Sequence, residues 1–285
     1  MAFRPRKRFG QNFLHDPGIA RKMIDAARLE AGQAVVELGA GRGFLTRPLA
    51  ELGTRLIAFE LDRDLHAELS ARLEGTAGVE LINADFTHVS LTSLLAERGL
   101  DACTLIGNIP YHLTREVLFS FLVDESEMIE KAYLMVQREV GDRIAAAPGS
   151  RTYGIPSVVL QSLYTVRSLF RVVAGSFTPR PKVDSVVIGF EALESPRIRR
   201  DELRHFVGLV KNLFQQRRKT IHNTLRGAYS LSATELRQLG KSTGIDPEKR
   251  PEMLSPQDFL AVSRAIAGMT PGAHGDGTMM QGRRW

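Results

Sequence analysis

Between Asp16 and Glu191, short apolar runs alternate with amphipathic stretches. Continuous apolar runs are typical of strands buried on both faces, and they predict strands at residues 34–38, 56–60, 79–83, 103–107, 132–136 and 183–190. Apolar residues at helical spacing predict helices at residues 45–52, 63–73 and 91–98. An earlier helix begins at Pro17, because Asp16 is a suitable N-cap and proline is favoured at the first helical position. This alternation predicts an α/β, Rossmann-like domain with a mostly parallel sheet and helices on both faces.

The pattern changes after Glu191, where basic, helix-forming stretches follow and no convincing strand does. Apolar spacing there predicts helices at residues 203–214, 217–225, 233–239 and 256–266. The last residues are rich in glycine, methionine and threonine, a composition typical of disorder. We therefore expect three parts: an α/β domain with a basic N-terminal arm at 1–192, a small all-helical domain at 193–268, and a disordered tail at 269–285.

The composition is that of an ordinary globular protein, with 43% hydrophobic and 25% charged residues. The formal net charge of +6 favours an anionic partner such as nucleic acid. Cys103 is the single cysteine, so no intrachain disulfide can form. No apolar run approaches the roughly 20 residues that span a bilayer, and the basic N-terminus lacks the apolar stretch of a secretory signal. We expect a monomeric, cytoplasmic protein with no membrane segment and no metal site.

A glycine-rich turn directly follows the first predicted sheet strand. The sequence there is Gly39-Ala40-Gly41-Arg42-Gly43, and a helix follows it. Glycine lets a backbone turn tightly and approach a ligand closely, and a helix N-terminus opening onto such a turn is a polar binding platform. Glu60 ends the next strand, where a carboxylate is suited to the two ribose hydroxyls of an adenosine. Phe44 replaces the last glycine of the nicotinamide fingerprint, which argues against a dehydrogenase.

The sequence from Glu37 to Gly43 has the pattern E-x-G-x-G-x-G, which instead resembles the first signature of class I S-adenosyl-L-methionine methyltransferases. That resemblance implies S-adenosyl-L-methionine as the cofactor, with Gly39 and Gly41 beside it. Asp85 stands at the end of the third strand. In this fold class an acidic residue there accepts from the adenine amine of the cofactor.

The motif Asn108-Ile109-Pro110-Tyr111 follows the fourth strand, and it is the most specific chemistry in the chain. The exocyclic amine of adenine is a weak nucleophile because its lone pair is delocalised into the ring. The Asn108 amide oxygen and the Ile109 carbonyl can accept hydrogen bonds from that amine and so localise the lone pair. Pro110 fixes the backbone so that these acceptors converge, and Tyr111 offers a flat face on which the base can stack. The motif predicts methyl transfer to adenine.

These motifs together resemble the adenine-N6 rRNA dimethyltransferase family, and the resemblance runs from Arg6 to about Ile266. The segment 7–14 is similar to the family's N-terminal cofactor motif, which implies that Asn12 and Leu14 touch the methionine part of the cofactor. Gly39, Glu60, Asp85 and Asn108 stand at the other family cofactor positions. The segment 176–185 is similar to a further shared segment, which implies that Phe177 faces the target base opposite Tyr111.

The family has a housekeeping branch, which dimethylates two adjacent adenines near the 3′ end of small-subunit rRNA, and a macrolide-resistance branch, which acts on large-subunit (23S) rRNA. The segments at 137–154, 214–225 and 244–252 are similar to the housekeeping branch. We therefore expect 16S rRNA within a pre-30S particle as the partner. Two alternatives remain open from the sequence: the 23S enzyme of the resistance type, and a non-catalytic ribosome-assembly factor.

Basic residues gather in three clusters that we interpret as contacts to the rRNA backbone. The clusters are Arg4, Arg6, Lys7 and Arg8; Arg197, Arg199 and Arg200; and Arg217, Arg218 and Lys219. The third cluster is expected on a helix of the second domain, which would then help to select the RNA.

Overall fold

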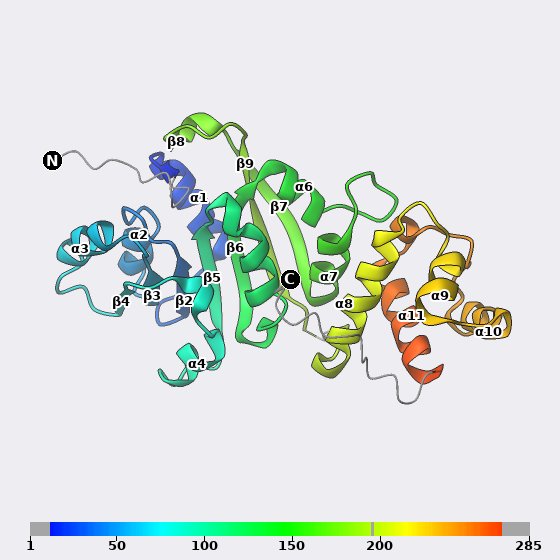
Figure 1. Ribbon diagram of the computed structural model, residues 1–285. Helices are drawn as coiled ribbons and strands as arrows, with labels where there is room; N and C mark the ends of the chain where they lie inside the picture. Colours follow the sequence, from blue (N-terminus) through cyan, green and yellow to red (C-terminus); the bar gives the residue numbers. More distant parts are fainter. Residues whose placement is uncertain (1–11, 195–196, 270–285) are drawn as a thin grey trace. The chain divides into compact units, whose positions relative to one another are not determined.

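The computed structural model describes residues 12–194 and 197–269 (Figure 1). It divides into two compact units, which are described separately. The first unit comprises Met1–Gly141 and Thr165–Ala192, and the second comprises Asp142–Tyr164 and Leu193–Trp285. The second unit resumes at Leu193, next to the expected boundary at 192/193, and it also contains the segment 142–164, which the sequence analysis assigned to the α/β domain.

A seven-stranded sheet forms the first unit within the described residues, in the order β4-β3-β2-β5-β6-β9-β7. Neighbouring strands from β4 to β6 are parallel, and β9 is antiparallel to β6. This confirms the predicted mostly parallel α/β sheet. The strands are β2 (Ala34–Leu38), β3 (Arg55–Phe59), β4 (Val79–Ile82), β5 (Cys103–Asn108), β6 (Ile129–Gln137), β7 (Tyr164–Val172) and β9 (Ser185–Ala192).

Strand β7 was not predicted, because polar residues interrupt its apolar positions. Arg167, Ser168 and Arg171 fall within it, and as the last strand in the sheet order it leaves much of its surface accessible. A run of this kind lacks both the continuous apolar character of a central strand and strict alternation.

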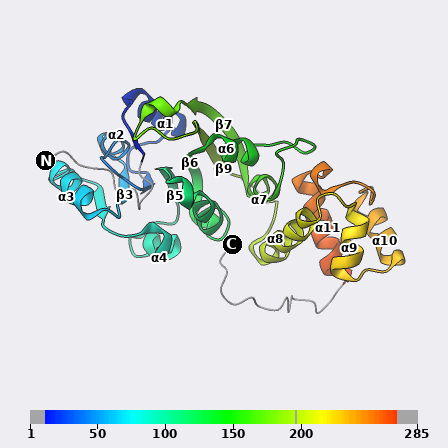
Figure 2. The same cartoon turned by 45° about the horizontal axis from the view of Figure 1, so that its top comes forward.

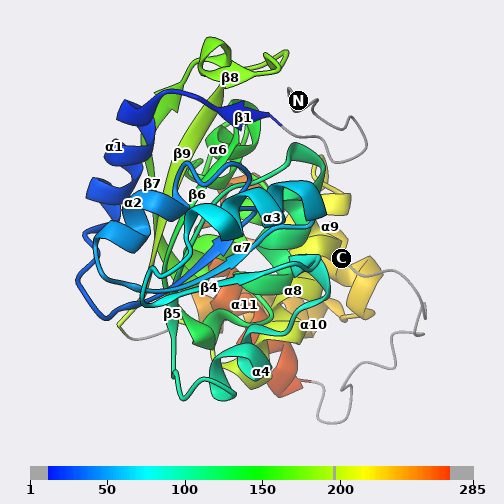
Figure 3. The ribbon, with the colours of Figure 1, turned by 90° about the vertical axis from the view of Figure 1, so that its left-hand side faces the viewer.

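The first four α-helices of this unit lie at the predicted positions, whereas α5 and α6 were not predicted. The helices are α1 (Pro17–Ala27), α2 (Thr46–Glu51), α3 (Arg63–Arg72), α4 (Leu91–Ala96), α5 (Thr114–Glu116) and α6 (Arg138–Ile144), the last of which crosses into the second unit. The Asp16 carboxylate accepts the Gly18 N–H at 2.9 Å and so caps α1, as predicted. Helix α1 lies beside α2 (Figure 3) and buries Met23 and Ile24 in the core, each contributing about 1.5–3 kcal/mol of hydrophobic stabilisation.

A two-stranded ribbon joins the N-terminal segment to a distant part of the chain. Strand β1 (Phe13–Leu14) pairs with β8 (Phe177–Thr178) in antiparallel register, and the His15 N–H donates to the Ser176 carbonyl at 3.1 Å. Two-residue strands carry no detectable periodicity, so the sequence pattern did not predict this pairing. Its consequence is that residues 12–14 are held as a strap, a name we keep for this segment.

The second unit is helical, with α7 (Ile155–Leu163), α8 (Arg200–Gln215), α9 (Ile221–Tyr229), α10 (Ala233–Thr243) and α11 (Pro256–Met269) (Figure 2). Helix α7 packs against both α8 and α11, which is why the segment 142–164 belongs to this unit. The Ser232 hydroxyl and the Glu235 carboxylate form a capping box that starts α10.

One helix of this unit begins four residues later than predicted. The helix predicted at 217–225 begins at Ile221, because the Thr220 side chain caps it and residues 216–219 form a turn. Arg217, Arg218 and Lys219 therefore lie in a turn rather than on a helix. The predicted tail 269–285 lies outside the described residues, except for Met269, which ends α11.

Candidate active site

The glycine-rich turn after β2 folds back toward the carboxylate that ends β3. Gly39 and Gly41 have φ of 81° and 57°, a conformation that favours glycine. The Gly41 N–H donates to Glu60 Oε2 at 2.7 Å, and the Asp62 N–H donates to Glu60 Oε1 at 2.7 Å. Burial raises the pKa of Glu60, and these two amides act in the opposite direction. Each carboxylate oxygen keeps a lone pair for a further donor, so Glu60 can still bind a hydroxyl.

Glu37 brings a second, fully buried carboxylate to the same place. It stands in β2, and its Oε2 atom has no hydrogen-bond partner among the described residues. Burial raises the pKa of Glu37 to about 7, and the Glu60 carboxylate adds to the rise while Thr46 opposes it. A buried acceptor without a partner is costly, so this position is suited to a cationic or donor group of a ligand.

The ends of β3 and β4 each present an acidic residue followed by an apolar one. Asp85 Oδ1 accepts the Thr87 N–H at 3.0 Å and the Thr87 hydroxyl at 2.7 Å. Its other oxygen accepts nothing from the described residues. Leu61 follows Glu60 and is 44% exposed despite being apolar. Phe86 follows Asp85 and is buried. Apolar side chains beside a free carboxylate oxygen are suited to a flat heterocycle that carries an amine.

Asn108, at the end of β5, meets the N-terminal strap. Its Nδ2 donates to the Asn12 carbonyl at 3.1 Å, although 96 residues separate the two. This bond fixes the orientation of the amide, because the nitrogen is committed to the strap. The Asn108 Oδ1 atom accepts nothing from the described part of the chain and remains available to a ligand.

The residues after Asn108 are also held in place. The Ile109 N–H donates to the Met135 carbonyl of β6 at 3.3 Å, while its own carbonyl accepts no hydrogen bond from the residues described. The Tyr111 hydroxyl lies 2.8 Å from Ser185 Oγ, at the start of β9. Burial raises the pKa of Tyr111, and the bond to Ser185 acts in the opposite direction.

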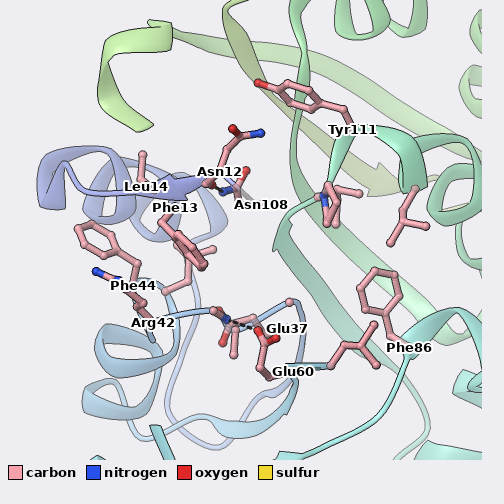
Figure 4. Close-up of a pocket in the computed structure, with 18 of the residues that line it drawn as sticks. Asn12, Phe13, Leu14, Glu37, Arg42, Phe44, Glu60, Phe86, Asn108 and Tyr111 are labelled. Carbon is pink, nitrogen blue, oxygen red and sulfur yellow. Dashed lines mark hydrogen bonds between the residues drawn. The ribbon is translucent and has the colours of Figure 1, made fainter. Parts of the chain in front are cut away.

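These side chains line one cavity of about 320 Å³, large enough for a ligand of nucleoside size (Figure 4). In Figure 4, Tyr111 and Glu60 lie toward opposite ends of the labelled group, with Asn108 between them. The cavity brings together every predicted cofactor position and the whole predicted catalytic motif: Asn12, Leu14, Gly39, Gly41, Glu60, Asp85, Asn108, Ile109, Pro110 and Tyr111.

Phe177 is the predicted site residue that the structure does not bring to this cavity. Its side chain is 3% exposed and packs in the hydrophobic core with Leu14 and Val172. The reason is strand alternation: in β8, Phe177 points inward and Thr178 outward. The expected position of Phe177, opposite Tyr111, is therefore not the one found here.

Sequence reasoning missed several residues of the cavity, among them Glu37, Leu61 and Phe86. Glu37 begins the E-x-G-x-G-x-G signature but was given no role in the site, although a charged residue inside an otherwise apolar run was a usable signal. Leu61 and Phe86 each follow an acidic strand end, where a turn would ordinarily place a polar residue. Phe13, also in the wall, has the Arg42 guanidinium 5.2 Å from the centre of its ring.

The basic clusters are only partly consistent with RNA contacts. Arg217 is committed within the second unit, because it pairs with Glu252 at 3.4 Å and donates to the Arg151 carbonyl at 3.0 Å. Arg218 and Lys219 are exposed beside it. In the second cluster, Arg199 pairs with Asp201 at 3.1 Å. The first cluster, Arg4 to Arg8, lies outside the described residues.

Within the described part of the chain, no group of histidine, cysteine and acidic residues is arranged to hold a metal ion. Cys103 is buried, and burial raises its pKa to about 12, which disfavours the reactive thiolate. Among the helices described, none combines the length and the apolar character required to cross a membrane.

Comparison with known proteins places these features in a family context. A family model described as ribosomal RNA adenine dimethylase matches residues 2–268. A protein of Geobacter metallireducens named ribosomal RNA small subunit methyltransferase A is 39% identical, covering 93% of this chain and 97% of its own length. A protein of the same name from Syntrophotalea carbinolica is 41% identical, covering 93% of this chain and 98% of its own length.

Two solved structures share the fold. A dimethyladenosine transferase from Plasmodium falciparum has a TM-score of 0.72 at 24% identity, covering 88% of this chain and 95% of its own. The 23S rRNA methyltransferase ErmE has a TM-score of 0.70 at 23% identity, covering 90% and 99%. These structures show the class I methyltransferase fold, and because a 23S rRNA methyltransferase shares it, the fold alone does not identify the RNA substrate.

Proposed function

The chain belongs to the ribosomal RNA adenine dimethylase family, and from this premise we propose that it dimethylates the N6 amines of two adjacent adenosines near the 3′ end of 16S rRNA. As a family member it is an S-adenosyl-L-methionine-dependent methyltransferase. The small-subunit substrate is supported by the two relatives above, which are named for the small subunit and align over almost their whole length.

The cavity fits this cofactor on two observations of the structure. A Cβ atom built on Gly39 would meet nothing within 4 Å, so the turn leaves open space where a ligand would pass. The unpartnered Oε2 of Glu37 calls for a cationic or donor group. When bound, S-adenosyl-L-methionine supplies an electrophilic methyl group on its sulfonium sulfur.

Different residues of the cavity would hold different parts of the cofactor. Glu60 would accept the ribose hydroxyls with its remaining lone pairs, and the free oxygen of Asp85 would accept the adenine amine. Leu61 and Phe86 would contact the faces of that adenine. Glu37, which lies beside Glu60, would bind the ammonium group of the methionine part, and the strap residues Asn12 and Leu14 would cover that part.

Asn108 carries the proposal, because its geometry is that of a positioned acceptor. The strap holds the amide nitrogen, so Oδ1 is presented to the cavity beside the unoccupied carbonyl of Ile109. Two acceptors would take hydrogen bonds from the target amine, localise its lone pair and aim it. Tyr111 would stack on the base. Such an arrangement requires no strong general base.

Neither alternative reading is favoured. ErmE supports only a shared fold at its level of identity, whereas the small-subunit relatives are 39% and 41% identical. A non-catalytic assembly factor would not need Glu60, Asp85 and Asn108 around one cavity. We further propose that the enzyme acts as a monomer in the cytoplasm, on a pre-30S particle.

The direct test is methylation of small subunits isolated from cells that lack this enzyme. With S-adenosyl-L-methionine, the purified protein is expected to convert two adjacent adenosines near the 3′ end of 16S rRNA to dimethyladenosine, detected by primer extension and mass spectrometry. Large ribosomal subunits without methylation serve as the parallel substrate. Methylation of large-subunit RNA alone would overturn the proposal in favour of the resistance branch.

A further inference from the structure

The hydroxyl of Tyr111 is anchored across the sheet by one residue. Ser185 Oγ lies 2.8 Å from the Tyr111 oxygen, and 74 residues separate them in the chain. No other described residue hydrogen-bonds this hydroxyl. Tyr111 stands in a short turn after Pro110 and is only half-buried. Without the anchor, packing alone would have to set the plane of its ring.

Ser185 is a rigid anchor because its surroundings fix it on every side. It is completely buried and begins β9, opposite Gln137 of β6. The preceding residue, Asp184, accepts the Ala174 N–H at 2.9 Å and pairs with Arg171. The Asp184 carbonyl in turn accepts the Arg138 N–H at 3.0 Å. The backbone of Ser185 therefore has a fixed position relative to the sheet, and its buried side chain reaches the Tyr111 hydroxyl from there.

The chain segment that leads to Ser185, residues 177–185, also supports the Asn108 amide. Strand β8, at Phe177–Thr178, pairs with the strap whose Asn12 carbonyl holds the Asn108 amide. Residues 177–185 thus approach the site twice, once through the strap toward Asn108 and once through Ser185 toward Tyr111. This gives the segment a use in the site although Phe177 itself lies in the core.

We propose that Ser185 is a positioning residue, which fixes the plane of the Tyr111 ring so that a stacked adenine presents its N6 amine to the acceptors of Asn108 and Ile109. The inference rests on the proposed function, since it concerns the adenine substrate. The hydroxyl bond contributes by alignment: a base stacked on a tilted ring would carry its amine away from the two acceptors.

A double-mutant cycle tests this coupling. Ser185→Ala and Tyr111→Phe each remove one side of the hydrogen bond while keeping the ring. Loss of one such bond corresponds to about a two- to thirteenfold fall in the single-turnover rate of methyl transfer to unmethylated small subunits. Because both changes remove the same bond, the double variant should be no slower than the slower single variant. Affinity for S-adenosylhomocysteine should be unchanged in all three.

Further variants separate positioning from mere structural support. Ser185→Thr keeps the hydroxyl and should restore most of the rate, whereas Ser185→Cys, of similar size but a weaker hydrogen-bonding group, should be intermediate. Ser185→Cys also takes the place of Ser185→Ala in the cycle if the alanine variant does not fold. The loss should appear in the rate at saturating substrate rather than in substrate affinity.

If the double variant loses rate by the product of the two single losses, the inference is overturned, because Ser185 then acts independently of Tyr111. A full rate in folded Ser185→Ala overturns it as well. Both results leave the proposed function intact, since the wild-type enzyme still methylates the particle. Failure of the wild-type enzyme to methylate adenosine in any small subunit is the separate outcome that removes the proposed function and this inference with it.

Discussion

Glu37→Gln tests whether the buried carboxylate beneath the glycine turn belongs to the cofactor site. Burial raises the pKa of Glu37 to about 7 from an ordinary value of 4.5. The difference of about 2.5 units corresponds to about 3 kcal/mol, at about 1.4 kcal/mol per unit. Because the folded-state pKa is raised, the contribution of Glu37 to stability is complete below pH 4.5 and is lost as the pH rises to about 7.

Unfolding experiments should therefore distinguish the two proteins by pH. At pH 8 the wild-type cavity holds an ionised, desolvated carboxylate, so Glu37→Gln should be more stable by about 3 kcal/mol. At pH 4.5 this advantage should disappear. The measurement is urea unfolding of both proteins at each pH, compared as a difference so that other titrating groups cancel. Equal stability at pH 8 would show that Glu37 is not desolvated.

Although Glu37→Gln should raise stability at pH 8, it should weaken the binding of ligand at that pH. If Glu37 binds the ammonium of the methionine part, ligand binding favours the ionised carboxylate. Wild-type affinity for S-adenosylhomocysteine should then rise about tenfold from pH 6 to pH 8, as expected for a free-state pKa of about 7. Glu37→Gln should bind more weakly at pH 8 and show a smaller pH dependence.

Calorimetric titration in two buffers of different ionisation enthalpy counts the protons released on binding. Glu60 also lies in the cavity and its pKa is raised by burial, so Glu60→Gln is the matched control. Binding of the ammonium by Glu37 is refuted if wild-type and Glu37→Gln proteins show the same pH dependence and release the same number of protons. Glu37 would then be a structural carboxylate rather than a ligand for the cofactor.

Three other changes test the rest of the site. Glu60→Ala should weaken S-adenosylhomocysteine binding by about 1.5–3 kcal/mol, or about ten- to a hundredfold, by calorimetry, and unchanged affinity in a folded variant would remove Glu60 from the site. Asn108→Ala should slow single-turnover methyl transfer by about 2.7–4 kcal/mol while small-subunit binding persists, and near-normal transfer would refute the acceptor role. Charge reversal at the exposed Arg218 and Lys219 should lower RNA affinity and flatten its salt dependence, whereas Arg217→Ala should chiefly cost about 1 kcal/mol of stability through its lost partner Glu252. An unchanged salt slope would place that turn away from RNA.

The sequence by itself determined the sheet and brought together most of the residues that line the cavity. Buried parallel strands read as continuous apolar runs, and β2, β3 and β5 were found from that signal within a residue or two. The less buried edge strand β4 was found from its apolar residues despite Glu80. Parallel strands end at one edge of the sheet, so residues that follow successive strands meet there. For this reason Gly39, Glu60, Asp85 and Asn108 were correctly expected to lie together.

Tertiary structure decided what each of these side chains faces. The strap reaches Asn108 only because β1 pairs with β8, a contact between residues more than 160 positions apart that two-residue strands cannot signal. Only the packing around β2 leaves the Glu37 carboxylate buried with an oxygen that has no hydrogen-bond partner among the described residues. The same pairing directs Phe177 into the core, away from its expected place. Local pattern fixes where a strand ends, but the partners that orient its last side chain come from long-range packing, which periodicity does not encode.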